Sequence, residues 1–217
     1  MSALAEVLSR LSHDVRAPLG LAASALGELD ASLGPEQRAL VALAGKGLKR
    51  LERLAERLGL AAELERGALR LDREPQSGRE LVQRACARAA ALEARRGVNL
   101  TLTLPVSEPE PRLAVDAPRL VSALAELVGN AWRHARSQIE VIVRDGAGEG
   151  LEVAVEDDGA GVSEAARPWL FTRFEPAAGR AAGNLGLMLA RAVARAHGGE
   201  VTLEPAARTR FVLRLPA

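Results

Sequence analysis

One apolar-periodic segment of the chain contains Ser12-His13-Asp14-Val15-Arg16-Ala17-Pro18-Leu19. A proline inside a helix removes a backbone hydrogen bond and tends to bend the helix there. We expect the bend to leave His13 on the solvent-facing side, with Asp14 beside it to hold one ring nitrogen. An imidazole in this position is suited to react with a ligand rather than to pack in a core. The alternative is an ordinary solvated pair of histidine and aspartate.

The apolar residues around this stretch have the spacing of a helix bundle. From residue 3 to about residue 33 they are Leu4, Leu8, Leu11, Val15, Leu19, Ala22, Leu26, Leu29 and Leu33. Gly34 and Pro35 then end this helix and start a second one. The apolar stripe of the second helix comprises Leu40, Leu43, Gly47, Leu51, Leu54 and Leu58. Because two such helices cannot bury both apolar faces alone, residues 1–70 are predicted to form a hairpin that dimerises into a four-helix bundle. A hairpin packed on the chain's own second domain is the alternative.

The pattern changes to mixed helix and strand after the polar stretch 73–78. Helices are predicted at residues 79–95, 117–135 and 185–197, and strands at 98–104, 139–144, 151–155, 200–203 and 210–215. Asp116 is a predicted N-cap, with Pro118 in the first turn of its helix. Helices segregated against a mostly antiparallel sheet define an α+β fold, and we assign it to a second domain at residues 71–217.

Composition excludes several classes of protein. The chain has 217 residues, a net charge of +1 and one cysteine, Cys86. The near-neutral charge favours neither a nucleic-acid partner nor a membrane surface. No stretch approaches the roughly 18 apolar residues of a membrane span, and no signal-peptide pattern opens the chain. We therefore expect no membrane contact from this chain and a cytoplasmic location, with a membrane-bound parent protein still open.

The predicted helix at residues 117–135 carries two oxygen-bearing side chains one turn apart. Glu126 and Asn130 share a helix face and can hold Mg²⁺ together with phosphate oxygens and waters. Arg133, on the next face, is placed to meet a phosphate. His134 at the end of this helix and His197 at the end of a later one are interpreted as polar helix-end residues, the latter favoured by the helix dipole.

Two glycine-containing segments follow in the second domain. The first is Asp157-Asp158-Gly159-Ala160-Gly161, directly after a predicted strand, where glycines allow a tight turn and a close backbone approach to a ligand. A carboxylate there can accept a hydrogen bond from a base amine. The second runs from Phe171 and Phe174 to Gly183-Asn184-Leu185-Gly186-Leu187, and its helix start can close over phosphates. An ordinary Asp-Gly turn and a surface loop are the alternatives.

In their order along the chain, these segments resemble the H, N, G1, F and G2 boxes of sensor histidine kinases, over nearly the whole sequence. The resemblance implies a dimerisation and histidine-phosphotransfer hairpin, followed by the α/β sandwich ATP-binding domain shared with DNA gyrase, Hsp90 and MutL. It implies ATP and Mg²⁺ as cofactors. It also implies a homodimer and the receiver domain of a response regulator as partners.

The resemblance also implies a role for each matching residue. His13 is the phosphoacceptor, and Asp14 orients it and accepts its proton. Asn130 binds Mg²⁺, while Glu126 stands where many kinases have a second asparagine and is similar to the carboxylate of gyrase-like ATPases. Nucleotide contacts are implied for Arg133, Asp157, Gly159, Gly161, Phe171, Phe174, Gly183, Leu185, Gly186 and Leu187.

The implied function is an autophosphorylating protein-histidine kinase that passes its phosphoryl group to an aspartate of a response regulator. Ala182 and Asn184 replace two glycines that are frequent in the family's lid, so a phosphotransfer or scaffold protein with a decayed nucleotide site is the main alternative. A nucleotide-driven ATPase switch without a histidine step is a third. Ala17 stands where related kinases typically have Thr or Asn, a side chain thought to orient the water that hydrolyses the regulator's phosphoaspartate. Alanine has no hydrogen-bonding side chain, so weak regulator-phosphatase activity is predicted.

Overall fold

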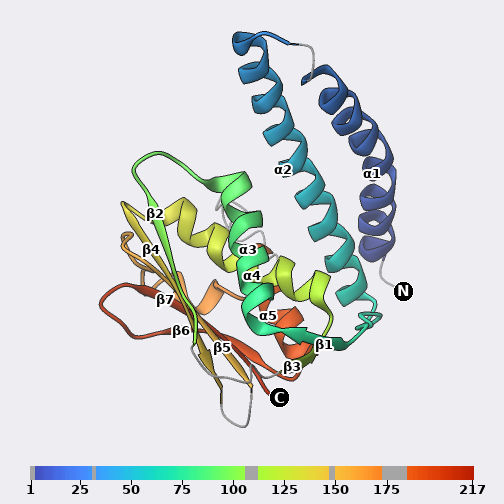
Figure 1. The fold of residues 1–217 in the computed structure, drawn as a ribbon. Helices are drawn as coiled ribbons and strands as arrows, with labels where there is room; N and C mark the ends of the chain where they lie inside the picture. Colours follow the sequence, from blue (N-terminus) through green and yellow to red (C-terminus); the bar gives the residue numbers. More distant parts are fainter. Residues whose placement is uncertain (1–2, 31–32, 106–111, 147–149, 173–184) are drawn as a thin grey trace. The chain divides into compact units, whose positions relative to one another are not determined.

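The chain forms two compact units, Met1–Leu69 and Arg70–Ala217. The computed structural model describes residues 3–30, 33–105, 112–146, 150–172 and 185–217 (Figure 1).

The first unit is the predicted helical hairpin. Helix α1 (Ala3–Asp30) and helix α2 (Pro35–Glu65) run side by side (Figure 1). Gly34 is the N-cap of α2, and Pro35 occupies its first turn, where a missing N–H costs nothing. Helix α1 continues through Pro18 to Asp30 without interruption.

Small residues bring the two helices close together. Ala5 and Ala62 are fully buried, and Ala55 is nearly so. A Cβ atom added at Gly59 would lie only 2.8 Å from the hydroxyl oxygen of Ser12. A further set of apolar residues on the two helices is exposed on the surface of the single chain. Its exposed members are Val7, Leu11, Val15, Leu21, Leu40, Leu43, Leu51 and Leu54.

The second unit contains a five-stranded sheet in the order β2-β4-β5-β7-β6. Its strands are β2 (Asn99–Thr103), β4 (Gln138–Asp145), β5 (Leu151–Asp157), β6 (Glu200–Glu204) and β7 (Thr209–Leu215). Strands β2 and β4 are parallel, and the other neighbours are antiparallel. The predicted mostly antiparallel sheet is therefore confirmed.

Three helices cover one face of this sheet (Figure 1). They are α3 (Gly78–Glu93), α4 (Ala117–His134) and α5 (Leu185–Ala196). Helix α4 lies in the middle, against both other helices and against strands β4 and β5. Its residues Leu120, Leu124 and Leu127 are buried, as are Val153 and Leu213 of the sheet. This packing of apolar helix and strand faces makes the predicted α/β sandwich.

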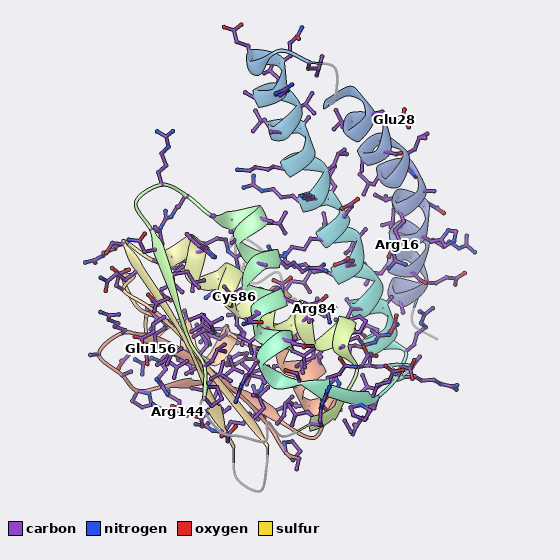
Figure 2. All side chains as sticks on the ribbon, viewed as in Figure 1. Arg16, Glu28, Arg84, Cys86, Arg144 and Glu156 are labelled. Atoms are coloured by element: carbon purple, nitrogen blue, oxygen red, sulfur yellow. The ribbon has the colours of Figure 1, made fainter. Side chains whose placement is uncertain are left out.

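The other face of the sheet carries ion pairs. Arg210 of β7 pairs with Glu156 of β5 and Glu204 of β6, and Arg214 pairs with Glu152. Figure 2 labels Glu156 together with Arg144, which also pairs with Glu152. Cross-strand pairs of opposite charge stabilise a solvated sheet face.

A two-stranded ribbon departs from the sequence prediction. Strand β1 (Glu74–Ser77) pairs antiparallel with β3 (Arg112–Val115). The sequence pattern indicated a polar connection at residues 73–78 and no strand at 112–115. Four-residue strands carry too little periodicity to be recognised, and their pairing joins segments that are distant along the chain.

His197 directly follows α5, as its interpretation as a helix-end residue predicted, but it is more than a residue at a helix end. It is buried, its Nε2 accepts a hydrogen bond of 3.0 Å from the backbone N–H of Asp116, and its Nδ1 lies 2.8 Å from the carbonyl oxygen of Val193. Burial lowers the pKa of His197, although the Val193 carbonyl opposes this. The neutral imidazole therefore links the start of α4 to the end of α5.

The single cysteine behaves as a core residue. Cys86 lies on α3 (Figure 2), and burial raises the pKa of its thiol to about 11. It is therefore a poor nucleophile. Within the described residues, no helix combines the length and the apolar character that crossing a membrane requires.

Candidate nucleotide-binding site

The last residue of strand β5 is a fully buried carboxylate, Asp157. Its Oδ1 accepts a hydrogen bond of 2.9 Å from the backbone N–H of Gly159. Its Oδ2 is buried and has no hydrogen-bond partner among the described residues. Burial raises the pKa of Asp157, opposed first by the Gly159 N–H and then by the hydroxyl of Thr209. Because unpaired buried polar atoms are rare and costly, this oxygen marks a place for a ligand donor.

Both glycines of the turn after Asp157 are required by geometry. A Cβ atom at Gly159 would lie 2.5 Å from Oδ1 of Asp157 and 2.6 Å from the carbonyl oxygen of His134. Gly161 has a φ of +79°, which side chains rarely tolerate. The turn therefore presents bare backbone beside the buried carboxylate.

Asp158, to which the sequence pattern assigned no role, ties this turn to the end of α4. Its carboxylate accepts hydrogen bonds from the backbone N–H groups of Arg136, Ser137 and Gln138, at 2.8, 3.0 and 3.1 Å. The Ser137 hydroxyl donates a further bond of 2.7 Å. These donors, the Ser137 hydroxyl foremost, hold the pKa of Asp158 well below its usual range.

Helix α4 presents the predicted pair of oxygen ligands. Its start is set by Asp116, whose side chain accepts from the backbone N–H of Arg119 at 3.1 Å, as expected of an N-cap. Glu126 and Asn130, one turn apart, are only 7% and 8% exposed. The described residues contain no group of three or more His, Cys, Asp or Glu side chains able to hold a metal. Two protein oxygens completed by phosphates and waters are nevertheless a usual arrangement for Mg²⁺.

Arg133 has protein partners in this structure. It lies 3.3 Å from a carboxylate oxygen of Glu93 on α3 and donates a 3.4 Å hydrogen bond to Oδ1 of Asn130. The predicted contact between Arg133 and a phosphate stays a prediction.

Phe171 is held between two neighbours. Its ring meets that of Phe211 edge-on, with the centroids 6.2 Å apart, and the guanidinium of Arg191 on α5 lies 4.8 Å from its centroid. On α5, Gly186 and Leu187 are buried and Leu185 is half-buried. Phe174 and Gly183 lie outside the described residues.

A cavity of about 680 Å³ adjoins the glycine turn. Its lining includes Gly159, Gly161, Phe171, Arg191 and Thr209. This volume is in the range of ligand pockets. Its lining does not include Asp157, Glu126 or Asn130, so we define the candidate site by the buried carboxylate and the α4 oxygens rather than by the cavity.

Thr209 is a second residue that the sequence pattern did not reveal. It lies opposite Asp157 in the register of β5 and β7, and its hydroxyl helps to lower the pKa of Asp157. Nothing local in the sequence indicates this neighbour, because it depends on which strands pair and in what register.

His13, in the hairpin, has the predicted exposure. Its side chain is 90% exposed, and its Nδ1 lies 3.6 Å from a carboxylate oxygen of Asp14. The preceding Ser12 is buried and donates a hydrogen bond of 2.8 Å to the carbonyl oxygen of Ala55 on α2. The histidine thus stands in solvent on a helix anchored by its neighbour.

Comparisons with known proteins agree with this arrangement. Residues 115–217 match the family model described as histidine kinase-, DNA gyrase B-, and HSP90-like ATPase. The chain is 30% identical over 222 residues to the sensor-like histidine kinase SenX3 of Mycolicibacterium smegmatis, covering 97% of this chain and 57% of that protein. It is 32% identical over 230 residues to the signal transduction histidine-protein kinase AfsQ2 of Streptomyces coelicolor, covering 95% and 40%. The chain thus spans about half the length of these relatives.

Solved structures show the same fold. Full-length ShkA in complex with AMPPNP superposes with a TM-score of 0.70 at 25% identity, over 97% of this chain and 45% of that one. The histidine kinase AdeS of Acinetobacter baumannii gives a TM-score of 0.61 at 18% identity, over 94% and 97%, and shows the fold alone. The chain is thus similar over nearly its whole length to sensor histidine kinases, and its residues 115–217 match the histidine kinase-, DNA gyrase B-, and HSP90-like ATPase family.

Proposed function

We propose that this chain catalyses the ATP-dependent phosphorylation of His13 and passes the phosphoryl group to an aspartate of a response regulator. The observation that carries the proposal is the buried Oδ2 of Asp157, which has no hydrogen-bond partner in the part of the chain that the structure describes and lies beside a turn of bare backbone. That oxygen matches the amine of an adenine base, which donates a hydrogen bond and can enter a buried pocket.

The phosphate side of the nucleotide faces different residues. Glu126 and Asn130 would hold Mg²⁺ together with the phosphate oxygens, and a bound ion would supply positive charge that offsets the charge of the phosphates. Glu126 also adds a carboxylate near the reacting phosphate. Further nucleotide contacts are assigned to Arg133, Gly159, Gly161, Phe171, Phe174, Gly183, Leu185, Gly186 and Leu187, as the family resemblance implies.

The reacting atom of His13 follows from its contact with Asp14. Because Nδ1 faces the Asp14 carboxylate, Nε2 is left free toward solvent. Nε2 attacks the γ-phosphorus of ATP in line, the N–P bond forms, and the bond to the leaving oxygen of ADP breaks. The imidazolium formed then loses its Nδ1 proton to Asp14, which leaves a phosphohistidine with a neutral imidazole ring.

The hairpin supports a homodimer. Seven large apolar residues of the predicted bundle stripe and its flank are more than a third exposed in the single chain: Val7, Leu11, Val15, Leu40, Leu43, Leu51 and Leu54. A second hairpin would bury them in a four-helix bundle. Analytical ultracentrifugation should therefore show a dimer, and Leu51→Glu should shift it toward monomer.

Labelling with radioactive ATP and Mg²⁺ tests the kinase assignment. The purified chain should acquire an acid-labile, base-stable phosphoryl group. His13→Gln should abolish the label and leave nucleotide binding intact. His134→Gln, which changes an exposed histidine at the end of α4, is the matched control and should still be labelled. Label retained in His13→Gln would contradict the assignment of His13.

Direct titration separates the kinase from a phosphotransfer or scaffold protein with a decayed nucleotide site. The kinase binds a nonhydrolysable ATP analogue in the presence of Mg²⁺, and the decayed-site protein does not. Incubation of the labelled chain with isolated receiver domains then tests the transfer step, since label should move to the aspartate of a cognate regulator. A chain that binds the analogue and hydrolyses ATP without ever labelling a histidine would be an ATPase switch instead.

A further inference from the structure

The turn after Asp157 is joined to the end of α4 by one side chain. The Asp158 carboxylate accepts hydrogen bonds from three consecutive backbone N–H groups, of Arg136, Ser137 and Gln138, and from the Ser137 hydroxyl. Arg136 and Ser137 belong to the connection between α4 and β4, and Gln138 is the first residue of β4. In return, the backbone N–H of Asp158 donates to the carbonyl oxygen of Gln138 at 3.2 Å.

Close packing adds to this junction. The missing side chain of Gly159 lets the turn approach the carbonyl oxygen of His134, the last residue of α4. The turn therefore touches the helix end on one side and the following connection on the other.

The junction lies between the two halves of the candidate site. Asn130 stands one helical turn before the end of α4, and Asp157 directly precedes Asp158 in sequence. Few rotatable bonds separate Asp158 from either residue. Movement at this junction would change the distance between Asp157 on the adenine side and Asn130 on the phosphate side.

We propose that Asp158 is a positioning residue of the nucleotide site, whose carboxylate fixes the placement of Asn130 relative to Asp157. The inference rests on the proposed function, because it assumes that both residues contact one nucleotide. A nucleotide that contacts both Asp157 and Asn130 binds tightly only when the distance between these two residues matches the length of the nucleotide.

The role is separable from folding. The residues whose N–H groups bind Asp158 are exposed, so water can replace the carboxylate when it is removed. Strands β4 and β5 remain paired from Ile139 opposite Asp157 to Asp145 opposite Leu151, independently of the Asp158 side chain. The Asp158→Ala variant should therefore fold, but Asn130 and Asp157 should no longer be held at a fixed distance from each other.

Two probes that differ in length test the inference. A nonhydrolysable ATP analogue with Mg²⁺ reaches both halves of the site, whereas adenosine reaches only the Asp157 half. In Asp158→Ala, the dissociation constant of the analogue should rise about tenfold, as is typical when a residue supporting a binding site is lost. The dissociation constant of adenosine should change much less. Calorimetric titration measures the first and NMR titration the second.

Two variants complete the design. Asp158→Asn keeps an oxygen acceptor for the three N–H groups, and its amide can donate to the Ser137 hydroxyl, so it should restore most of the affinity. Glu164→Ala removes an exposed carboxylate from the same loop and should bind like the unmodified chain.

Four outcomes decide the matter. Unchanged analogue binding in Asp158→Ala would overturn the inference, as would an equal loss of both probes together with a lower melting temperature. An unmodified chain that binds neither probe would contradict the proposed function itself. Selective loss of the analogue, with rescue by asparagine, supports the inference.

Discussion

The hydroxyl of Ser12 donates a hydrogen bond of 2.8 Å to the carbonyl oxygen of Ala55, and so ties the residue before His13 to the opposite helix. Both residues are buried. The helices can approach this closely because α2 has a glycine one turn further on, at Gly59. The exposed histidine therefore stands on a tightly packed part of the hairpin.

A side chain added at Gly59 should destabilise the hairpin. A Cβ atom at Gly59 would lie 2.8 Å from the Ser12 hydroxyl oxygen and 3.2 Å from a guanidinium nitrogen of Arg16, a residue labelled in Figure 2. Gly59→Ala should lower the free energy of unfolding by about 1–3 kcal/mol, measured by urea titration with circular dichroism.

A glycine of the same helix provides the control for this overpacking. Outside the helix's own backbone, no described atom lies within 4 Å of the position that a Cβ at Gly45 would take. Gly45→Ala should stabilise the helix by about 0.5–1 kcal/mol, because alanine loses less backbone entropy than glycine. Equal stabilisation by both changes would show that the helices do not meet at Gly59.

Asp157→Asn should weaken nucleotide binding while stabilising the fold. The raised pKa of Asp157 means that folding disfavours its charged form, a cost present at neutral pH and relieved as pH falls through the folded-state pKa. Asparagine removes that cost, so the melting temperature should rise. When its oxygen accepts from the Gly159 N–H, the asparagine places an NH2 donor where the carboxylate had Oδ2, and this donor faces the donor of the base amine. The dissociation constant for ATP should therefore rise roughly 10- to 100-fold.

The same assays distinguish Asp157 from Asn130. Asn130→Ala should chiefly lower the Mg²⁺-dependent rate of autophosphorylation, because it removes a ligand on the phosphate side. If neither Asp157→Asn nor Asn130→Ala alters autophosphorylation, the nucleotide site has been wrongly placed.

The second unit should lose stability in mild acid through His197. Its folded-state pKa lies below its unfolded value because of burial. The unfolded chain therefore binds the extra proton, and stability is lost as pH falls from about 6.5, the ordinary histidine pKa, toward the folded value. The charged residues near its ring are Arg73, Asp116 and Arg119.

A glutamine at this position should remove that acid sensitivity. His197→Gln keeps an oxygen that can accept from the Asp116 N–H and has no titrating ring. Melting temperatures between about pH 7.5 and pH 5.5 should fall for the unmodified chain and fall less for the variant. Parallel pH dependences would show that another group is responsible.

Ala17 is expected to leave the chain with little regulator-phosphatase activity. It is exposed on α1, four residues after His13 and so on the same face, where a methyl group cannot orient a water. A phosphorylated receiver domain mixed with the unmodified chain and ADP should decay slowly, and Ala17→Thr should speed the decay. Fast dephosphorylation by the unmodified chain would refute this expectation.

Much of the fold was predictable because its signals are local. The apolar repeats around Leu19 and Leu51 predicted the hairpin helices, and Asp116 with Pro118 predicted the start of α4 within a residue. Alternating strands and glycine turns likewise predicted the sheet. The exposure of His13 agrees with the expectation drawn from the proline in its periodic helix.

Other features depend on segments that are distant along the chain. The pairing of β1 with β3, the register that sets Thr209 opposite Asp157, and the contact of His197 with Asp116 have no local pattern. Periodicity shows which face of an element is buried but not what covers it.

The sequence by itself therefore determined the order of the motifs, the helical hairpin and the α+β class, since each follows from the spacing of residues within one element. Only the tertiary structure decided that Asp157 keeps one oxygen without a partner among the described residues and that Asp158 binds the segment that follows α4. Both facts are relations between two strands or between a strand and a helix. Such relations arise only when packing brings the elements together, because hydrogen-bond partners and burial are properties of the assembled core.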